Sequence, residues 1–153
     1  PAASVPKAGG TVTITGKSNS TKLTFTSTPA EENGLTLTLP DNYTAAGKST
    51  ANGAVIADDP GATGEFVWSI SIANVPANVT VEELVANLTV TAKGGQTAQV
   101  TITQAAGDSM LELDKEVINL DVNGTAQTVN VISNDLWTWA QAAAKTALRM
   151  MKR

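Results

Sequence analysis

Three pairs of adjacent acidic residues are the positions where side chains could do chemistry: Glu31-Glu32, Asp58-Asp59 and Glu82-Glu83. A glycosidase needs two carboxyl groups held across a cleft, one of them with a raised pKa. Adjacent residues on a strand or in a turn direct their side chains to different faces, so none of these pairs meets that requirement. We therefore expect no catalytic residue among them.

Composition excludes further chemistry. The 153 residues include no His and no Cys, which removes the commonest general base, thiolate metal ligands and disulfides. A calcium site needs several oxygen ligands from one loop, and Asp41-Asn42 and Asp58-Asp59 each supply only part of such a loop. We interpret both as solvated turns, and we predict no metal, no cofactor and no enzymatic activity.

The three tryptophans fall into two groups. Trp68 alternates with Phe66, Ile70 and Ile72, which predicts a core position on a strand. Trp137 and Trp139 could form a platform that stacks on a sugar. We favour a different role, an anchor against a protein partner, because buried aromatic side chains dominate such contacts.

Alternation of apolar and polar residues predicts most of the chain to be half-buried strand. This period of two occurs over residues 11–16, 21–27, 35–39, 65–72, 88–92 and 97–104. Hairpin-type turn signals occur at Glu32-Asn33-Gly34 and Lys93-Gly94-Gly95. We predict an all-β fold, an immunoglobulin-like antiparallel β-sandwich, for residues 1–107.

Two connections in this predicted sandwich, residues 41–64 and 80–86, have sequence patterns that differ from the alternation of a strand. Residues 41–64 are rich in Ala, Gly, Asn and Thr, which predicts a long loop with at most one short strand near residues 54–57. Thr80-Val-Glu-Glu83 has the spacing of a capping box and predicts a single helical turn near residues 81–86.

A partial second β-module is predicted over residues 108–135. Strand patterns occur at 111–113, 117–122 and 125–133, with Asp121-Val-Asn-Gly124 as the turn between the last two. Thr128-Val-Asn-Val also resembles Thr11-Val-Thr-Ile, a weak internal repeat. We interpret this segment as the opening of a second copy of the same kind of domain.

Residues 136–153 predict a short basic amphipathic helix. The segment is rich in Ala, has no Gly or Pro, and repeats apolar residues at helical spacing. Residues 1–144 carry six lysines and fourteen acids, whereas the last nine residues carry four basic residues and no acid. This asymmetry predicts that the tail docks on an acidic neighbour. The predicted anchor residues are Trp137, Trp139, Lys145, Leu148, Arg149, Met151 and Lys152.

Two stretches resemble BACON domains, which are immunoglobulin-like sandwiches of Bacteroidetes surface proteins and of the phages that infect these bacteria. They are Ile102-Thr-Gln-Ala-Ala106 and Ser133-Asn-Asp-Leu-Trp137. The resemblance covers roughly residues 1–107 and then 110–139. In the family, a strand that ends near Ser-Asn leads into a strand that contains Trp, whereas the first copy here has Leu23 or Phe25 in that neighbourhood. It implies carbohydrate or mucin binding, or a role as a spacer or display module.

Our functional expectation is a structural or display module of a virion or cell-surface assembly, held by protein partners in a homo- or hetero-oligomer through its C-terminal region. The alternative is a secreted module that binds surface glycans. Four positive charges on an acidic body argue against nucleic acid as a partner. No apolar run is long enough to span a membrane, which argues against a membrane partner.

Overall fold

A computed structural model describes residues 1–141, and over this range the regular structure is strand apart from one short 3-10 turn, η1 (Pro60–Thr63). The chain divides into two compact units, Pro1–Ser109 and Met110–Arg153. The strands are β1 (Ala2–Val5), β2 (Gly10–Ser18), β3 (Leu23–Pro29), β4 (Asn42–Ala45), β5 (Lys48–Ala51), β6 (Phe66–Val75), β7 (Leu84–Ala92), β8 (Thr97–Gln104), β9 (Leu111–Leu113) and β10 (Val131–Ser133). The predicted all-β class is confirmed.

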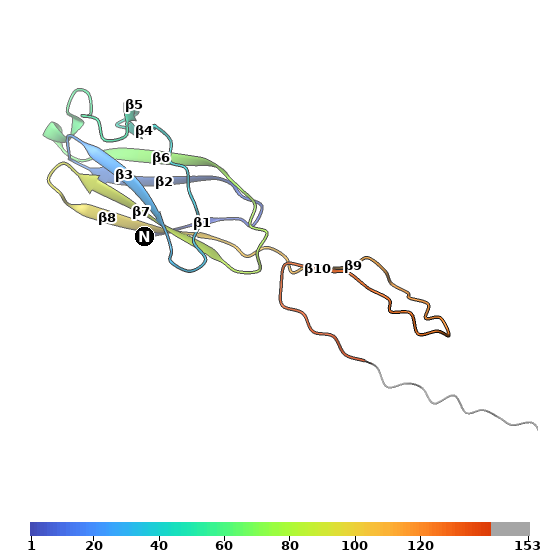
Figure 1. The fold of residues 1–153 in the computed structure, drawn as a ribbon. Coiled ribbons are helices and arrows are strands. Elements are labelled where there is room, and N and C mark those ends of the chain that lie inside the picture. The colour runs from blue at the N-terminus through green and yellow to red at the C-terminus, as the bar shows by residue number, and fades with distance from the viewer. Residues whose placement is uncertain (142–153) are drawn as a thin grey trace, which may run out of the picture. The chain divides into compact units, whose positions relative to one another are not determined.

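The first unit consists of two four-stranded sheets that face each other, as Figure 1 shows. One sheet has the order β1-β8-β7-β3 and the other the order β2-β6-β4-β5. All neighbouring strands are antiparallel except β1 and β8, which run parallel, so the prediction of an entirely antiparallel arrangement was wrong in this detail. The arrangement is sandwich-like, with apolar side chains from both sheets buried between them.

Trp68 lies in this core, as its alternation with apolar residues predicted, and only 6% of it is exposed. Its ring meets Phe25 edge to face at a centroid distance of 5.2 Å, and Phe25 in turn contacts Tyr43 at 4.7 Å. These three rings come from β6, β3 and β4, so they join the two sheets. Aromatic pairs of this geometry stabilise a core beyond their buried area.

The prediction of a long loop over residues 41–64 was wrong, because β4 and β5 form a hairpin within it. The turn places Ala46 and Gly47 at φ values of 48° and 78°, the left-handed conformations of a tight hairpin turn. Ala-Gly is a weaker turn signal than Asn-Gly, and the alternation of buried Tyr43 and Ala45 is short. At the predicted short strand, the structure has one isolated bridge, between Lys22 and Val55.

Two further connections differ from the sequence prediction. Leu35 is buried, but residues 35–39 form no strand. The chain pairs with β7 at this point only through an isolated parallel bridge between Gly34 and Val85, so Glu32-Asn33-Gly34 is not a hairpin turn. The helical turn near 81–86 is absent because β7 already begins at Leu84. The buried Asn78 side chain instead forms hydrogen bonds with backbone carbonyl groups around this loop: its Nδ2 donates to the carbonyl oxygens of Glu82 at 2.7 Å and Ala105 at 3.1 Å.

The described part of the second unit, residues 110–141, contains one small antiparallel ladder, in which Leu111 pairs with Ser133 and Leu113 with Val131. The predicted strand over 117–122 is absent, and only the end of the one over 125–133 forms. The predicted turn at Asp121 is present: its carboxylate accepts hydrogen bonds from the backbone N–H groups of Asn123 and Thr125. Local polar contacts, rather than a ladder, therefore organise this part of the chain.

The predicted helix over 136–153 is not supported where the structure describes it, because residues 136–141 are not helical. Trp137, Thr138 and Trp139 are aromatic and β-branched residues that favour extended backbone. Residues 142–153 of the predicted helix lie outside the described residues. Within residues 1–141, no helix has the length and apolar character needed to cross a membrane.

Candidate functional site

The acidic pairs lie on exposed connections and form no constellation for catalysis. Asp58 makes an ion pair with Lys48, whose hydrogen bond and positive charge hold the pKa of that carboxyl below its ordinary value. Glu31-Glu32 and Glu82-Glu83 are also exposed. Among residues 1–141, no group of three acidic side chains gathers closely enough to hold a metal ion.

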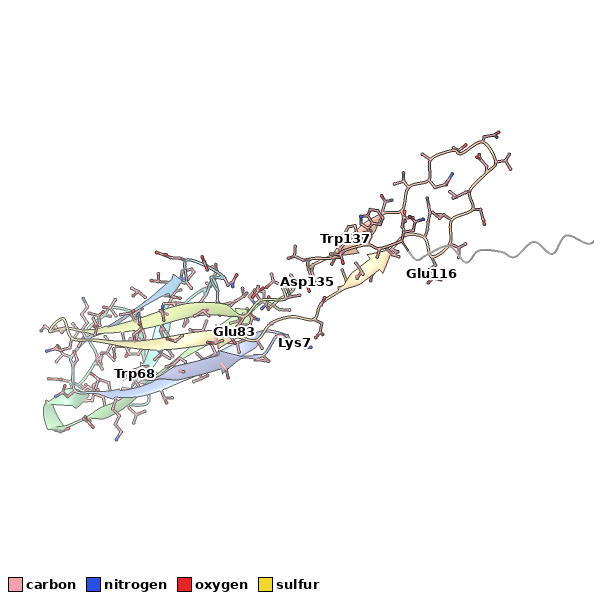
Figure 2. The ribbon with its side chains drawn as sticks, turned by 90° about the horizontal axis from the view of Figure 1, so that it is seen from below. Lys7, Trp68, Glu83, Glu116, Asp135 and Trp137 are labelled. Carbon is pink, nitrogen blue, oxygen red and sulfur yellow. The ribbon has the colours of Figure 1, made fainter. Side chains whose placement is uncertain are left out.

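The first unit carries an opening between the edge strand β2 and the first half of β8, which we call the Trp68 seam. Three hollows line it, with volumes of about 770, 380 and 160 Å³. All three share Lys17 of β2, and the two smaller ones share Trp68, Val90 and Ala98. The seam therefore leads from solvent to Trp68 of the aromatic core, a residue that Figure 2 labels among the strands of the first unit.

The seam exists because β1 is shorter than β8. Residues Ala2–Val5 pair with Thr101–Gln104, which leaves the preceding residues 97–100 of β8 paired to β7 alone. Ala92 donates its N–H to the Gln96 carbonyl oxygen at 2.9 Å, which sets the alternation of hydrogen-bonded pairs along the β7–β8 ladder. By that alternation, the N–H and C=O of Gln99 are directed away from β7, at an open sheet edge.

Small residues keep the seam open on both sides. Ala98 is at an inward position of β8, in line with buried Val100, yet it is exposed. On β2, a Cβ added at Gly16 would lie 2.3 Å from the Cζ2 atom of Trp68, so the indole rests directly against the glycine backbone. A larger residue at Gly16 would displace Trp68 and change the shape of the seam.

One end of the seam is charged. Lys17, Lys93 and Glu65 line its largest hollow, together with the hydroxyl groups of Ser18 and Ser20. In the part of the chain that the structure describes, the ion pairs are Lys7 with Asp108 and Lys48 with Asp58, so neither lysine of the seam is neutralised by an acid at close range. The seam thus offers an apolar slot whose charged end carries two lysines and one acid.

Over residues 110–141 the second unit presents the opposite feature, large apolar side chains that are exposed. Of the fourteen large hydrophobic residues that are exposed among residues 1–141, eleven belong to it. They are Met110, Leu111, Leu113, Val117, Ile118, Leu120, Val122, Ile132, Leu136, Trp137 and Trp139. Contiguous exposed apolar surface marks interaction sites in soluble proteins.

The predicted anchor residues fall partly within the described chain. Trp137, which Figure 2 labels, is 48% exposed. Trp139 is 81% exposed, so neither indole is buried by the other described residues. Lys145, Leu148, Arg149, Met151 and Lys152 lie outside the described residues.

Sequence reasoning missed the Trp68 seam and its lysines. Gly16 and Ala98, small residues at inward positions of alternating strands, are the signal that could have indicated an opening. The parallel pairing of β1 with β8, which decides where the open edge begins, had no such signal.

Comparison with known proteins places the chain in a family. The family model described as Toastrack DUF4097 matches residues 2–136. The chain belongs to the Toastrack family. The Toastrack match runs from β1 to Leu136 and so includes strands of both units. No curated protein matches the chain.

The Toastrack match overturns the resemblance to BACON domains. The residues that carried the resemblance are the end of β8 with the connection after it, and the end of β10 with the residues up to Trp137. A strand that closes in Thr-Gln and a strand that leads to Trp are short patterns that different sandwich-like proteins can share. The expectation of glycan binding therefore loses its family basis.

Proposed function

We propose that the chain is a non-catalytic structural module that joins a larger protein assembly through its second unit. The observation that carries this proposal is the concentration of exposed apolar side chains in residues 110–139. Burying them against a partner would release ordered water, and each aromatic side chain could contribute on the order of 2 kcal/mol or more as a hot spot. The first unit, with its own core, serves as the rigid body that is displayed or positioned.

The strand order supports an immunoglobulin-like reading of this rigid body, and we include that reading in the proposal. In chain order, β3, β7 and β8 correspond to strands C, F and G of such a sandwich, while β2, β6 and β4 correspond to B, E and D. The first strand departs from the constant-type order, since β1 lies beside β8 rather than β2. Sandwiches of this kind act as spacers and binding scaffolds whose function is in their edges and loops.

The absence of His and Cys from the sequence also supports a non-catalytic role. The acidic pairs are exposed, and the pKa of Asp58 is lowered by Lys48, whereas a general acid needs a raised one. As part of the proposal, we place the assembly on a virion or a cell surface.

Sedimentation velocity of the full chain over a range of concentrations tests the proposal. We expect larger species that disappear in the Trp137→Ser/Trp139→Ser double variant. The matched control is Val55→Ser/Val67→Ser, which removes two exposed apolar side chains from the first unit and should leave association unchanged. Equal behaviour of the two double variants would refute a specific role for the second unit.

The exposure of Trp139 also favours a second candidate, a glycan-binding role, because an exposed indole can stack on a sugar ring. A glycan array separates the two. Binding by the full chain that is lost in Trp137→Ser/Trp139→Ser, together with monomeric sedimentation, would favour the glycan and contradict the assembly role.

A further inference from the structure

We propose that a second copy of the chain adds its residues Leu136–Trp139, which we call the apolar segment, as a strand to the open edge of β8 in the Trp68 seam. This inference rests on the proposed function and names the partner of the second unit. It joins two features that are each incomplete alone: an unpaired strand edge above an apolar slot, and an exposed apolar segment without a core.

The backbone of β8 sets the length of strand that fits. Residues 97–100 are unpaired on the seam side, and Thr101 already donates its N–H to the Pro1 carbonyl oxygen at 3.2 Å. A four-residue segment therefore fills the open edge. In a parallel register Leu136 lies opposite Thr97 and Trp139 opposite Val100, and the outward N–H and C=O of Gln99 gain partners by strand addition.

The same register directs both tryptophans into the seam. Opposite residues on neighbouring strands face the same side of a sheet, so Trp137 follows Ala98 and Trp139 follows Val100, both of which face inward. Trp137 then meets the hollow of about 160 Å³ lined by Thr97 and Ala98. Trp139 meets the hollow of about 380 Å³, which Val100 and Pro1 line. Each would contact Trp68, which lines both hollows.

Charge complementarity selects the parallel direction. In that register Asp135 lies opposite Gln96, in the end of the seam where two lysines, Lys17 and Lys93, and one acid, Glu65, line the largest hollow. An antiparallel strand would carry Asp135 toward β1 and away from Lys93, which does not line the hollow beside β1. Residues 110–141 hold five acids and one lysine, so the approaching second unit is acidic as a whole. Such complementarity steers encounter and fixes register.

The proposed contact joins two different surfaces of identical chains. Copies therefore add until a ring closes or a filament grows. The smallest such ring is a dimer in which each copy places its apolar segment in the seam of the other.

Disulfide trapping tests the contact, and the chain has no native cysteine to interfere. Two full-length variants with tags of different size, Gln99→Cys and Thr138→Cys, are mixed and oxidised with oxidised glutathione. In the proposed register these two side chains lie opposite each other on the outer face. We expect the mixed disulfide to predominate, and to fall to background when Trp137→Ser/Trp139→Ser is added to the Thr138→Cys chain.

The control is Val67→Cys mixed with Thr138→Cys, because Val67 is exposed on β6, a central strand without an open edge. A second pair, Thr97→Cys with Leu136→Cys, reports the same parallel register if Gln99→Cys fails to fold. Trapping of both pairs no better than the control would overturn the proposal. So would a disulfide that forms only when both cysteines are placed in one chain.

The two levels of the proposal fail differently. If the chain associates through Trp137 and Trp139 but the cysteine pairs do not link, the second unit binds elsewhere and only the seam contact is wrong. If the chain does not associate at all, the proposed function fails as well.

Discussion

Replacing Trp68 by Ala tests whether this residue holds the two sheets together. Trp68 is 6% exposed and contacts Phe25 across the core. Burying an aromatic side chain removes about 150–250 Å² from water, which at roughly 25 cal/mol per Å² is an upper limit of about 4–6 kcal/mol. Because the seam lets water reach the resulting cavity, we expect the lower part of the range typical of Trp→Ala, about 3–4 kcal/mol.

Urea unfolding of the full chain, followed by far-UV circular dichroism, measures this loss. A domain of this size has a stability of about 5–15 kcal/mol, so the midpoint should fall by a large fraction while the variant still folds. Val67→Ala is the matched control: Val67 precedes Trp68 on β6 and faces solvent, and it should change stability by less than about 0.5 kcal/mol. A loss below about 1 kcal/mol for Trp68→Ala would contradict a core role and make Trp68 a surface residue of the seam.

Three other changes give distinct expectations. Asn52→Ala should destabilise the first unit by about 1–3 kcal/mol in the same assay, because Asn52 pairs through its amide with both the N–H (2.8 Å) and the C=O (3.0 Å) of Phe25; an unchanged midpoint would refute this. Gly16→Ala should cost about 1–3 kcal/mol and alter Trp68 fluorescence in a Trp137→Phe/Trp139→Phe background, since the new Cβ would clash with the indole. Acidification should loosen the second unit first. The backbone N–H of Asn130 lowers the pKa of Asp114, and the Thr125 hydroxyl lowers the pKa of Asp121. The stabilisation from these hydrogen bonds is therefore complete above the ordinary carboxyl pKa and is lost as the pH falls through the lower, folded-state pKa values. Amide chemical shifts of Thr125 and Asn130 should report that change in NMR spectra, and shifts that move together with those of the first unit would argue against it.

The sequence predicted the strands with long alternation because burial on one face imposes a period of two. This held for β2, β3, β6 and β8, whose inward residues include Ile14, Phe25 and Ile70. It failed where polar side chains replace regular backbone pairing. The amide groups of Asn52 and Asn78 satisfy backbone groups far away in sequence, and no local pattern predicts that.

The candidate site was predicted less well than the fold. Trp137 and Trp139 were chosen as anchors from their type alone, and their exposure agrees with that choice without testing it. The helix that was to present them does not begin at Leu136, because a Trp-Thr-Trp run favours extended backbone over helix. The seam depends on where β1 stops along β8, and strand pairing between distant segments is set by tertiary structure rather than by local sequence.

The central claim is that the second unit attaches the chain to a larger assembly, and cross-linking in the native source tests it most directly. A lysine-reactive reagent would be applied before lysis, and the cross-linked chain would be analysed by size and by mass spectrometry. Lys115 is the one lysine among residues 110–141, so it reports the second unit separately from the five lysines of residues 1–109. We predict that the chain elutes in a complex of several times its own mass, with Lys115 among the intermolecular cross-links. A chain that elutes as a free monomer, with Lys115 linked to no other molecule, would contradict the account.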